Sequence, residues 1–322
     1  MKGRGCCLLF VGCLGMADAC NAQGYPVRTV RVVVPFAAGG GADFVARVLS
    51  TKLTELLGQA VVVDNRPGAN GAIANELVAK SAPDGYTLLL GAAGALTISP
   101  VVFSSLPFDT LRDFAPISLA ASSPFCVTLH PSVPADSVTA LIALAQGRPG
   151  KLTFGSAGTG GAPHLAGELF MSMAGVKLVH VPYKGLAPAI TDLMGGQIDI
   201  SFADVGLVIG QVNAKKLKAV AVTGIKRSSL LPSVPTVAES GLPGYEAGTW
   251  YGVLAPRGTP AETVQKLNTE ILKVLGMADV RERFKTQGAD PAGTTPEEFQ
   301  VMLRTELAKW TKLVKAARIE IQ

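Results

Sequence analysis

The sequence predicts an α/β protein with two doubly wound lobes joined by two crossing segments. Continuous apolar runs alternate with segments of helical periodicity, which is typical of parallel strands covered by helices on both faces. This alternation stops at a long extended run over residues 115–128 and then begins again. A second extended run over residues 250–256 offers a return path. We therefore expect lobe I over residues 24–124 and 249–322, and lobe II over residues 125–248.

Lobe I is expected to begin with a strand over residues 31–36, a glycine-rich turn, and a helix from about Asp43 that ends at Gly58. Further strands are expected over residues 60–64 and 86–90, with a helix over about 72–81 between them. In a doubly wound sheet, ligands bind outside the carboxyl ends of the strands. The loops over residues 36–41, 65–71 and 92–95 should therefore converge on one edge.

Lobe II repeats this order. A helix is expected over residues 135–146, and strands are expected over residues 152–154, 178–181, 198–203 and 217–222, with helices between them. After the second crossing segment, Thr259-Pro-Ala-Glu and Thr295-Pro-Glu-Glu each have the pattern of a capping box with proline at the first helical position. The two helices that begin there are expected to return to lobe I.

Three glycines, Gly39, Gly40 and Gly41, stand directly before the first helix. Their backbone N–H groups are unobstructed, and together with the helix dipole they favour an anion. The loop is not a dinucleotide fingerprint, because Phe44 stands where the third glycine is required, and the chain has no Gly-Lys-Ser/Thr triplet. An ordinary strand-to-helix turn is the alternative. Asp43 is expected to cap the helix.

A second glycine-rich loop over residues 155–164 adds the hydroxyl groups of Ser156 and Thr159 to its N–H groups. A Gly-x-Ser-x-Gly nucleophile elbow is absent, because Phe154 occupies the first position. His164 could in principle activate Ser156, so a hydrolase is an alternative, although no third member of a triad is visible. No metal site is expected, because no His, Cys, Asp or Glu group has metal-ligand spacing, and no cofactor is expected.

Residues 1–23 have the composition of a signal peptide. Lys2 and Arg4 precede a short apolar segment that cannot span a bilayer, so we expect export and a periplasmic location. Acylation of Cys20 as a lipoprotein is the alternative, disfavoured by Ala17 where such sites usually carry leucine. Four of the five cysteines lie in this region, so only Cys126 is certain to remain. It is expected to be buried, and no internal disulfide can form.

The composition limits the classes of partner. At 322 residues and 48% hydrophobic, the chain can bury more than one core. Its net charge of +5 is spread along the sequence without a basic run, which argues against nucleic acid and suits a small acidic ligand.

Several long motifs occur in order: Val-Arg-Val-Val-Val-Pro-Phe-Ala-Ala-Gly-Gly-Gly-Ala-Asp at 30–43, Asn-Arg-Pro-Gly-Ala at 65–69, Ala-Pro-Asp-Gly-Tyr-Thr-Leu at 82–88, His-Leu-Ala-Gly-Glu-Leu-Phe at 164–170, Val-His-Val-Pro-Tyr-Lys-Gly at 179–185 and Pro-Thr-Val-Ala-Glu-Ser-Gly at 235–241. Together they resemble the Bug (TctC-like) family of extracytoplasmic solute-binding proteins over essentially the whole mature chain. The resemblance implies a type II periplasmic binding protein (Venus flytrap) fold that closes on a small carboxylate.

The resemblance also implies which residues face the ligand. They are Phe36, Ala37, Ala38, Gly39, Gly40, Ala93, Gly94, Ala95, Ser156, Ala157, Gly158, Thr159, His164 and Asp204. Family members frequently carry Phe-Asp-Asn at the last site, where this chain has Phe202-Ala203-Asp204. Asp204 could receive a ligand ammonium or hydroxyl group, or could cap the next helix. Lys184 could approach the ligand, but it is expected to be solvated.

We therefore expect an exported, monomeric binding protein without enzymatic activity. Its ligand would be a dicarboxylate, a tricarboxylate, an acidic amino acid or an aromatic acid, and its partner the membrane permease of a tripartite tricarboxylate transporter. Two alternatives remain at this point. One is a sensor that reports ligand to a signalling partner, and the other is a hydrolase that uses Ser156 and His164.

Overall fold

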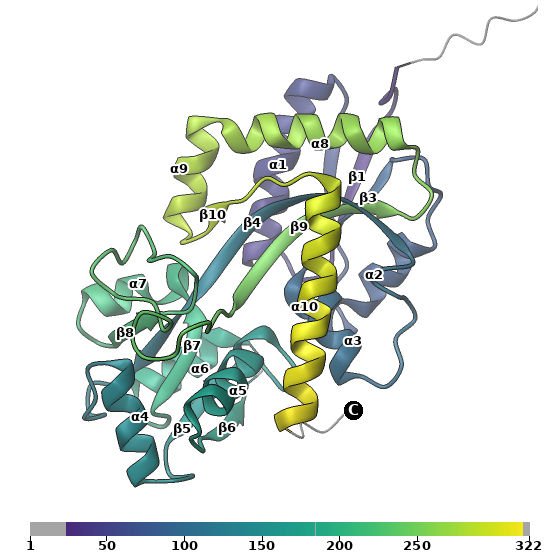
Figure 1. Cartoon of the computed structure of the whole chain (residues 1–322). Coiled ribbons are helices and arrows are strands. Elements are labelled where there is room, and N and C mark those ends of the chain that lie inside the picture. Colours follow the sequence, from purple (N-terminus) through teal and green to yellow (C-terminus); the bar gives the residue numbers. More distant parts are fainter. Residues whose placement is uncertain (1–23, 184, 318–322) are drawn as a thin grey trace, which may run out of the picture.

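The computed structural model describes residues 24–183 and 185–317 (Figure 1). The signal peptide predicted over residues 1–23, with the alternative acylation site at Cys20, lies outside these ranges, and so does Lys184. No helix within the described ranges is both long and apolar enough to cross a bilayer.

The described strands form a continuous ten-stranded sheet in the order β2-β1-β3-β9-β4-β7-β5-β6, with β8 and β10 also paired to β4. Strands β1, β2 and β3 are parallel, as are β5, β6 and β7. The bounds are β1 Val30–Val34, β2 Val61–Asn65, β3 Thr87–Ala92, β4 Phe114–Leu129, β5 Thr153–Ser156, β6 Val179–Pro182, β7 Ile200–Asp204, β8 Lys218–Val222, β9 Gly248–Pro256 and β10 Asp290–Pro291.

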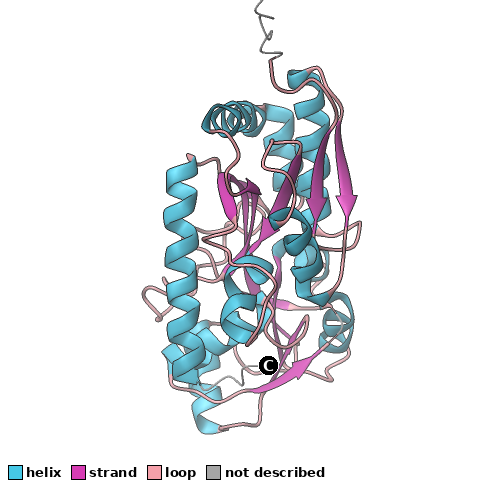
Figure 2. Cartoon of the chain, turned by 90° about the vertical axis from the view of Figure 1, so that its right-hand side faces the viewer, coloured by secondary structure: helices cyan, strands magenta, loops and turns pink. Residues whose placement is uncertain are grey.

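Helices lie on both faces of the sheet (Figure 2). Their bounds are α1 Gly41–Leu57, α2 Ala72–Ala79, α3 Ser99–Val102, α4 Val138–Gly147, α5 Ala162–Ala174, α6 Leu186–Met194, α7 Val205–Asn213, α8 Ala261–Gly276, α9 Ala278–Thr286 and α10 Pro296–Ala317. Short helical turns also form at Ala69–Gly71 and Gly94–Ile98. The alternation of strands and helices confirms the predicted fold class.

Strands β4 and β9 join the two halves of the sheet, and they run side by side across the middle of the molecule in Figure 1. From Phe114 to Pro124, β4 is antiparallel to β9. From Phe125 onwards it pairs instead with β7 and β8. The predicted crossing segments over 115–128 and 250–256 are therefore confirmed as β4 and β9.

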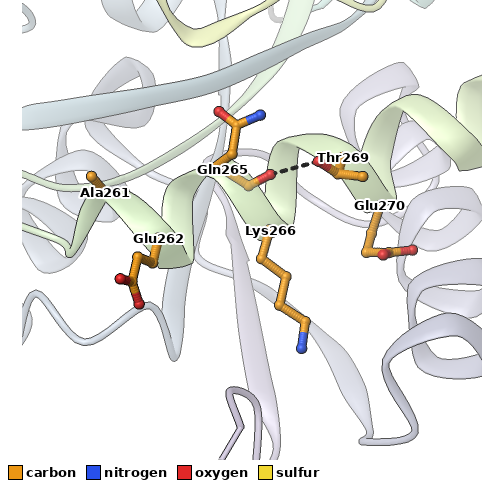
Figure 3. Close-up of a pocket in the computed structure, with 6 residues that line it drawn as sticks. All are labelled: Ala261, Glu262, Gln265, Lys266, Thr269 and Glu270. Carbon is orange, nitrogen blue, oxygen red and sulfur yellow. Dashed lines mark hydrogen bonds between the residues drawn. The ribbon is translucent and has the colours of Figure 1, made fainter.

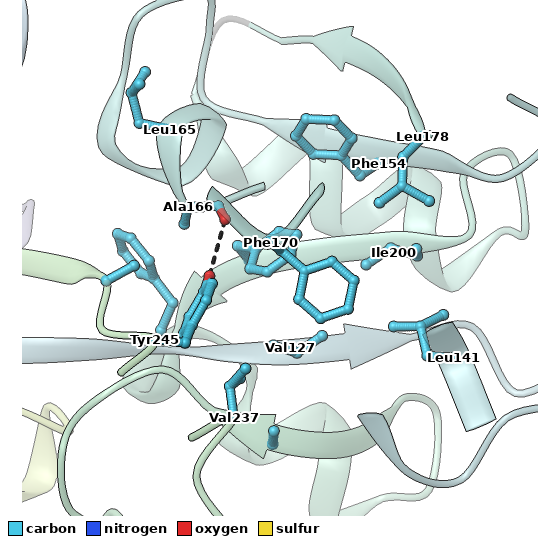
Figure 4. Packing of buried hydrophobic residues seen from close by; sticks show 14 of the residues in the cluster. Val127, Leu141, Phe154, Leu165, Ala166, Phe170, Leu178, Ile200, Val237 and Tyr245 are labelled. Atoms are coloured by element: carbon cyan, nitrogen blue, oxygen red, sulfur yellow. Dashed lines mark hydrogen bonds between the residues drawn. The ribbon is translucent and has the colours of Figure 1, made fainter. Parts of the chain in front are cut away.

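One part of the core of the second half is built from aromatic and aliphatic side chains on one face of β4, β5 and β7 (Figure 4). A separate cluster that includes Cys126 and Ala203 packs on the other face. Phe154 and Phe170 are fully buried in the first cluster, and the hydroxyl group of Tyr245 donates to the carbonyl of Ala166 at 2.9 Å. Trp310 and Leu313, near the end of α10, belong to the same cluster. Helix α10 therefore contacts both halves of the sheet.

The two predicted capping boxes have different outcomes. At α10, Glu298 Oε2 accepts from the Thr295 N–H at 2.9 Å, and Thr295 Oγ1 accepts from the Glu298 N–H at 3.2 Å, so the prediction is confirmed. At α8 the prediction is wrong, because Pro260 is the capping residue and makes no side-chain bond. The Thr259 hydroxyl instead donates to the carbonyl of Pro256 at 2.8 Å, within the preceding turn.

Cys126 lies on β4 and is fully buried, as the sequence predicts. Burial raises the pKa of its thiol to about 12, because the thiolate would lose its hydration. The thiolate is the reactive form, so this side chain is protected both sterically and electronically.

Gly252 permits close packing of α10 on β9. A Cβ atom at this position would overlap the ring of Phe299, which is fully buried. We expect Gly252→Ala to lower the free energy of unfolding by about 1–3 kcal/mol, the usual cost of overpacking. Gly210→Ala on the exposed side of α7 is the matched control, where open space surrounds the new Cβ and a gain of about 0.5–1 kcal/mol is expected. Urea unfolding midpoints measure both, and equal midpoints would contradict the packing.

Cys126 should be inert in the folded chain that begins at Gly24. A disulfide reagent at pH 8 should label it very slowly in the native protein and at once in denaturant, because only unfolding exposes the thiol and restores its ordinary pKa. Absorbance of the released thiolate follows the reaction. Rapid labelling of the native protein would mean that β4 is exposed.

Candidate functional site

A cavity of about 410 Å³ lies where loops from the two halves of the sheet meet. Loops at the carboxyl ends of parallel strands form two walls, and β4 and β9 form the floor. This is the position at which doubly wound sheets bind ligands. The lining residues are Phe36, Gly40, Gly41, Ala42, Asn70, Ala92, Gly94, Phe125, Ala157, Gly158, Thr159, Gly161, Ala162, Pro163, Leu186, Asp204, Thr249 and Tyr251.

The first wall is the start of α1, where Gly40, Gly41 and Ala42 line the cavity. The prediction that Asp43 caps this helix is wrong, because Gly40 is the capping residue. Asp43 lies in the first turn, and its Oδ2 accepts from the Gly39 N–H and from Arg47 Nε at 2.9 and 2.8 Å. The Arg47 hydrogen bond lowers the pKa of Asp43. Asp43 therefore holds the glycine loop rather than facing the cavity.

Two neighbouring loops complete this wall. Asn65 Nδ2 donates to the carbonyl of Phe36 at 3.0 Å, which ties the loop after β2 to the loop after β1. Asn70 lines the cavity and donates to Ser99 Oγ at 3.2 Å. Gly94 begins the helical turn after β3 and also lines the cavity. The three loops that the sequence placed on one edge do converge.

The second wall is the loop between β5 and α5. Ala157, Gly158 and Thr159 line the cavity, and α5 begins immediately afterwards. Gly158 has φ +135° and Gly160 has φ +77°, which are backbone conformations that L side chains rarely adopt. The glycines therefore let the backbone of this loop bend around the cavity and form its second wall.

A network of four polar side chains, two of them buried and two partly buried, lies behind this loop. Ser156 Oγ accepts from the Gly158 N–H at 3.1 Å and lies 2.6 Å from His180 Nε2. The His180 ring stacks on the His164 ring, with 3.9 Å between centroids. His164 Nδ1 accepts from the Gly160 N–H at 3.1 Å, which places the proton of the neutral ring on Nε2, 3.3 Å from Glu168 Oε1.

This network holds the loop and leaves no exposed nucleophile. Ser156 is fully buried, and its histidine neighbour is His180, not His164, which the sequence analysis considered as an alternative. Burial, and then the electrostatic effect of the neighbouring His164 ring, lower the pKa of His180 to about 4, so the His180 ring is neutral near neutral pH. The alternative of a hydrolase that uses Ser156 and His164 finds no support in this geometry.

The floor of the cavity carries polar groups from two strands. Asp204 ends β7, and Thr249 and Tyr251 lie on β9. Burial raises the pKa of Asp204 to about 6. Burial, and then the charge of Asp204, also raise the pKa of Tyr251, so the phenol stays protonated. A Cβ atom at Gly41 would lie 2.5 Å from the Tyr251 hydroxyl oxygen, so a larger residue here would displace the phenol from its place on the floor.

The residues expected to face a ligand fall into two groups. Seven line the cavity: Phe36, Gly40, Gly94, Ala157, Gly158, Thr159 and Asp204. The other seven, Ala37, Ala38, Gly39, Ala93, Ala95, Ser156 and His164, do not line it. Ala37, Ala38 and Gly39 are exposed, and the other four are buried.

Sequence reasoning missed Asn70, Leu186, Thr249 and Tyr251 as lining residues. Asn70 and Leu186 lie in or next to predicted loops. The expectation that loops at the carboxyl ends of the strands surround the ligand could therefore have included them. Thr249 and Tyr251 alternate along β9, and a strand that crosses under a cleft places every second side chain toward it. That alternation was the available signal, but the sequence did not specify which set faces the cavity.

Another hollow, on the surface of α8, is not a candidate site (Figure 3). Ala261, Glu262, Gln265, Lys266, Thr269 and Glu270 line it, and all of them lie on this one helix. No second element provides an opposite wall for a ligand. Among the described residues, no group of three His, Cys, Asp or Glu side chains could hold a metal ion.

The electrostatics of the cavity favour an anion. Helices α1 and α5 both begin on its walls, and so do α6 at Leu186 and α7 after Asp204. Each start presents N–H groups without helical partners and the positive end of a helix dipole. Among the described lining residues, Asp204 has the only side chain that is charged near neutral pH. Lys184, considered in the sequence analysis as a contact, is not among the described residues.

The sequence over residues 45–319 matches the family described as tripartite tricarboxylate transporter family receptor. A protein in the tcbD-tcbE intergenic region of Pseudomonas sp. (strain P51) is 42% identical, over 92% of this chain and 88% of its own. Protein BugT of Bordetella pertussis is 37% identical, over 95% of this chain and 94% of its own.

Solved structures of similar proteins also match this chain over most of its length. Rpa4515 of R. palustris with adipate superimposes with a TM-score of 0.82 at 38% identity, over 92% of this chain and 99% of its own. MatC of Rhodopseudomonas palustris with bound malate gives 0.77 at 32% identity, over 90% and 100% of the two chains. The chain therefore belongs to the family of tripartite tricarboxylate transporter receptors, the TctC or Bug family of non-enzymatic periplasmic solute-binding proteins.

Proposed function

We propose that this chain captures a small carboxylate between two lobes and delivers it to the membrane permease of a tripartite tricarboxylate transporter. One observation carries the proposal: α1 from the first half of the sheet and α5 from the second begin on opposite walls of the same cavity. Adipate and malate, the ligands bound by two solved relatives, are carboxylates of the size that such a cavity admits.

Backbone groups make the main contacts in this proposal. The N–H groups near Gly40 and Gly41 would meet the ligand from one side, and those from Ala157 to Thr159 from the other. Charge-assisted hydrogen bonds of this kind are about twice as strong as neutral ones, and exclusion of water strengthens them further. Ala37, Ala38 and Gly39 would act through the shape of their loop, and Ser156 and His164 through the network behind the second wall.

Closure of the lobes is the second part of the proposal. We assign residues 24–124 and 249–322 to lobe I and residues 125–248 to lobe II. The change of partner along β4 at Pro124 and Phe125 supports this boundary, and so does the start of β9 at Gly248. Because the end of α10 packs on the second lobe, we expect closure to be a small rotation about β4 and β9.

The cellular setting follows from the same family. We propose that residues 1–23 are removed on export, that the mature chain acts in the periplasm as a monomer, and that it docks on permease subunits without binding nucleic acid. A sensor that reports ligand to a signalling partner is the remaining alternative. Deletion of the permease separates the two, because it abolishes uptake in a transporter and leaves the response intact in a sensor.

A carboxylate panel tests the ligand class. In a thermal-shift assay on the chain from Gly24, at least one of dicarboxylates, tricarboxylates, acidic amino acids and aromatic acids should stabilise the protein. A ligand at 100 times its dissociation constant adds about 2.7 kcal/mol to the free energy of unfolding. The protein should first be unfolded and refolded to remove any ligand retained during purification. A panel without a shift would refute the proposal.

Gly94→Leu should abolish the thermal shift that a bound carboxylate produces. The position lines the cavity and has open space where a side chain would grow, so the leucine would occupy ligand volume without disturbing the core. Gly147→Leu is the matched control, because it also has open space but lies at the exposed end of α4. We expect unchanged ligand binding in the control and at least about tenfold weaker binding in Gly94→Leu. Equal binding by both variants would remove this cavity from the proposal.

Closure predicts a smaller radius of gyration in the liganded protein. Small-angle X-ray scattering should show a decrease when a carboxylate identified by the panel is added at saturation. Gly94→Leu, at the same ligand concentration, should show none. Binding of ligand by calorimetry with an unchanged scattering curve would argue that the lobes do not move.

A further inference from the structure

Asp204 is an acidic group in a cavity whose other features attract anions. It is the last residue of β7, and the side chain lines the floor. Among the described lining residues, no other side chain is charged near neutral pH. Asparagine would have the same shape as Asp204 without its charge. The question is therefore what the negative charge of Asp204 does in this cavity.

The sequence left open that the side chain of Asp204 caps the helix that follows it, and the structure does not show this role. Asp204 precedes α7 as its capping residue, yet its side chain makes no capping hydrogen bond. Within the described ranges, the carboxylate also takes part in no salt bridge and in no side-chain hydrogen bond. The carboxylate is partly buried, and a hydrogen bond from its own backbone N–H offsets only part of the lost hydration, so its pKa rises to about 6. The open side of this group is the cavity.

Among the described residues that line the cavity, only one further group beside Asp204 is titratable. β4 contributes Phe125, directly opposite in the register, and β9 contributes Thr249 and Tyr251. Of these, only the Tyr251 phenol can ionise, and its raised pKa keeps it neutral. The described lining residues therefore supply no cation for Asp204, whereas a cationic group of a ligand in the cavity would meet it directly.

We propose that the ligand carries a protonated amine as well as a carboxylate, with the amine paired to Asp204 and the carboxylate held by the N–H groups at the starts of α1 and α5. This inference rests on the proposed function and specifies its ligand class. A dicarboxylate would place a second negative charge near Asp204, whereas an ammonium group would neutralise it. A hydroxyl group could accept the hydrogen-bonding role but not the charge, so an amino acid fits better than a hydroxy acid.

Two matched ligand series test this by isothermal titration calorimetry on refolded protein at pH 7.5. Aspartate, malate and succinate differ only in an amine, a hydroxyl group or a hydrogen on the same carbon chain. 6-Aminohexanoate, adipate and hexanoate differ only in the terminal group. In at least one series, the amino member should bind about tenfold more tightly than its partners, as expected for a charge pair shielded from water.

Asp204→Asn should remove that preference and leave the non-amine members bound as tightly as before or more tightly. Asp136→Asn is the charge-matched control, since Asp136 is 90% exposed and pairs with Lys218 far from the cavity lining. The control should keep the preference of the parent chain. Asparagine keeps the shape of aspartate, so the variant is expected to fold. The order of ligand affinities for the parent chain is a second measurement, and it needs no variant.

The pH dependence provides an independent readout with opposite signs for the two ligand types. As the pH falls from 7.5 to 5, Asp204 takes up a proton near its pKa of about 6, so the amino ligand should lose affinity. A dicarboxylate would gain affinity, because its repulsion from Asp204 is removed. Asp204→Asn should show neither trend. The ligand amine and the Tyr251 phenol keep their charge states in this range. The second carboxyl group of a dicarboxylate takes up protons near pH 5, so the dicarboxylates are compared only between pH 7.5 and about pH 6.

The outcomes separate the two proposals. If a dicarboxylate binds as tightly as its amino partner and gains affinity at low pH, the amine pairing is overturned while carboxylate capture stands. If neither carboxylates nor amino acids bind to the refolded parent chain, the proposed function itself fails, and the amine pairing fails with it. A preference for the amine that persists in Asp204→Asn would assign the recognition to another group.

Discussion

The antiparallel pairing of β4 with β9 is the interaction on which the rest of the structure depends. It joins two sets of parallel strands that have no other continuous connection through the sheet. It also forms the floor of the cavity through Phe125, Thr249 and Tyr251. Because the same two strands connect the lobes and line the site, any rotation of one lobe about them changes the distance between the opposite walls. Ligand capture and domain geometry are therefore mechanically coupled.

The walls depend on backbone that is held from behind. Asp43 fixes the first glycine loop through the Gly39 N–H, and the Ser156, His180, His164 and Glu168 network fixes the second. Neither group of side chains lines the cavity. This arrangement preorganises N–H donors without placing competing acceptors near the ligand, which reduces the entropy cost of binding. It also explains why residues that look catalytic in the sequence act here as supports.

The charge distribution divides the cavity into two chemical regions. Helix starts on the two walls favour an anion, whereas Asp204 on the floor favours a cation. A ligand with one charge of each sign satisfies both regions, and a ligand with two negative charges satisfies only one. Two solved relatives hold adipate and malate, which carry two negative charges each.

The sequence by itself determined the α/β class, the two crossing segments, the three converging loops and the family, because apolar periodicity, glycine positions and long ordered motifs are local properties. It also predicted seven lining residues. Only the tertiary structure decided that Ser156 and His164 lie behind the wall, that Ser156 contacts His180, and that the Asp204 side chain makes no capping hydrogen bond to α7. It also decided that Tyr251 faces the cavity, because the facing set on β9 depends on a register with β4 that two irregularities shift. Pairing register and burial arise from contacts distant in sequence, so no local pattern could specify them.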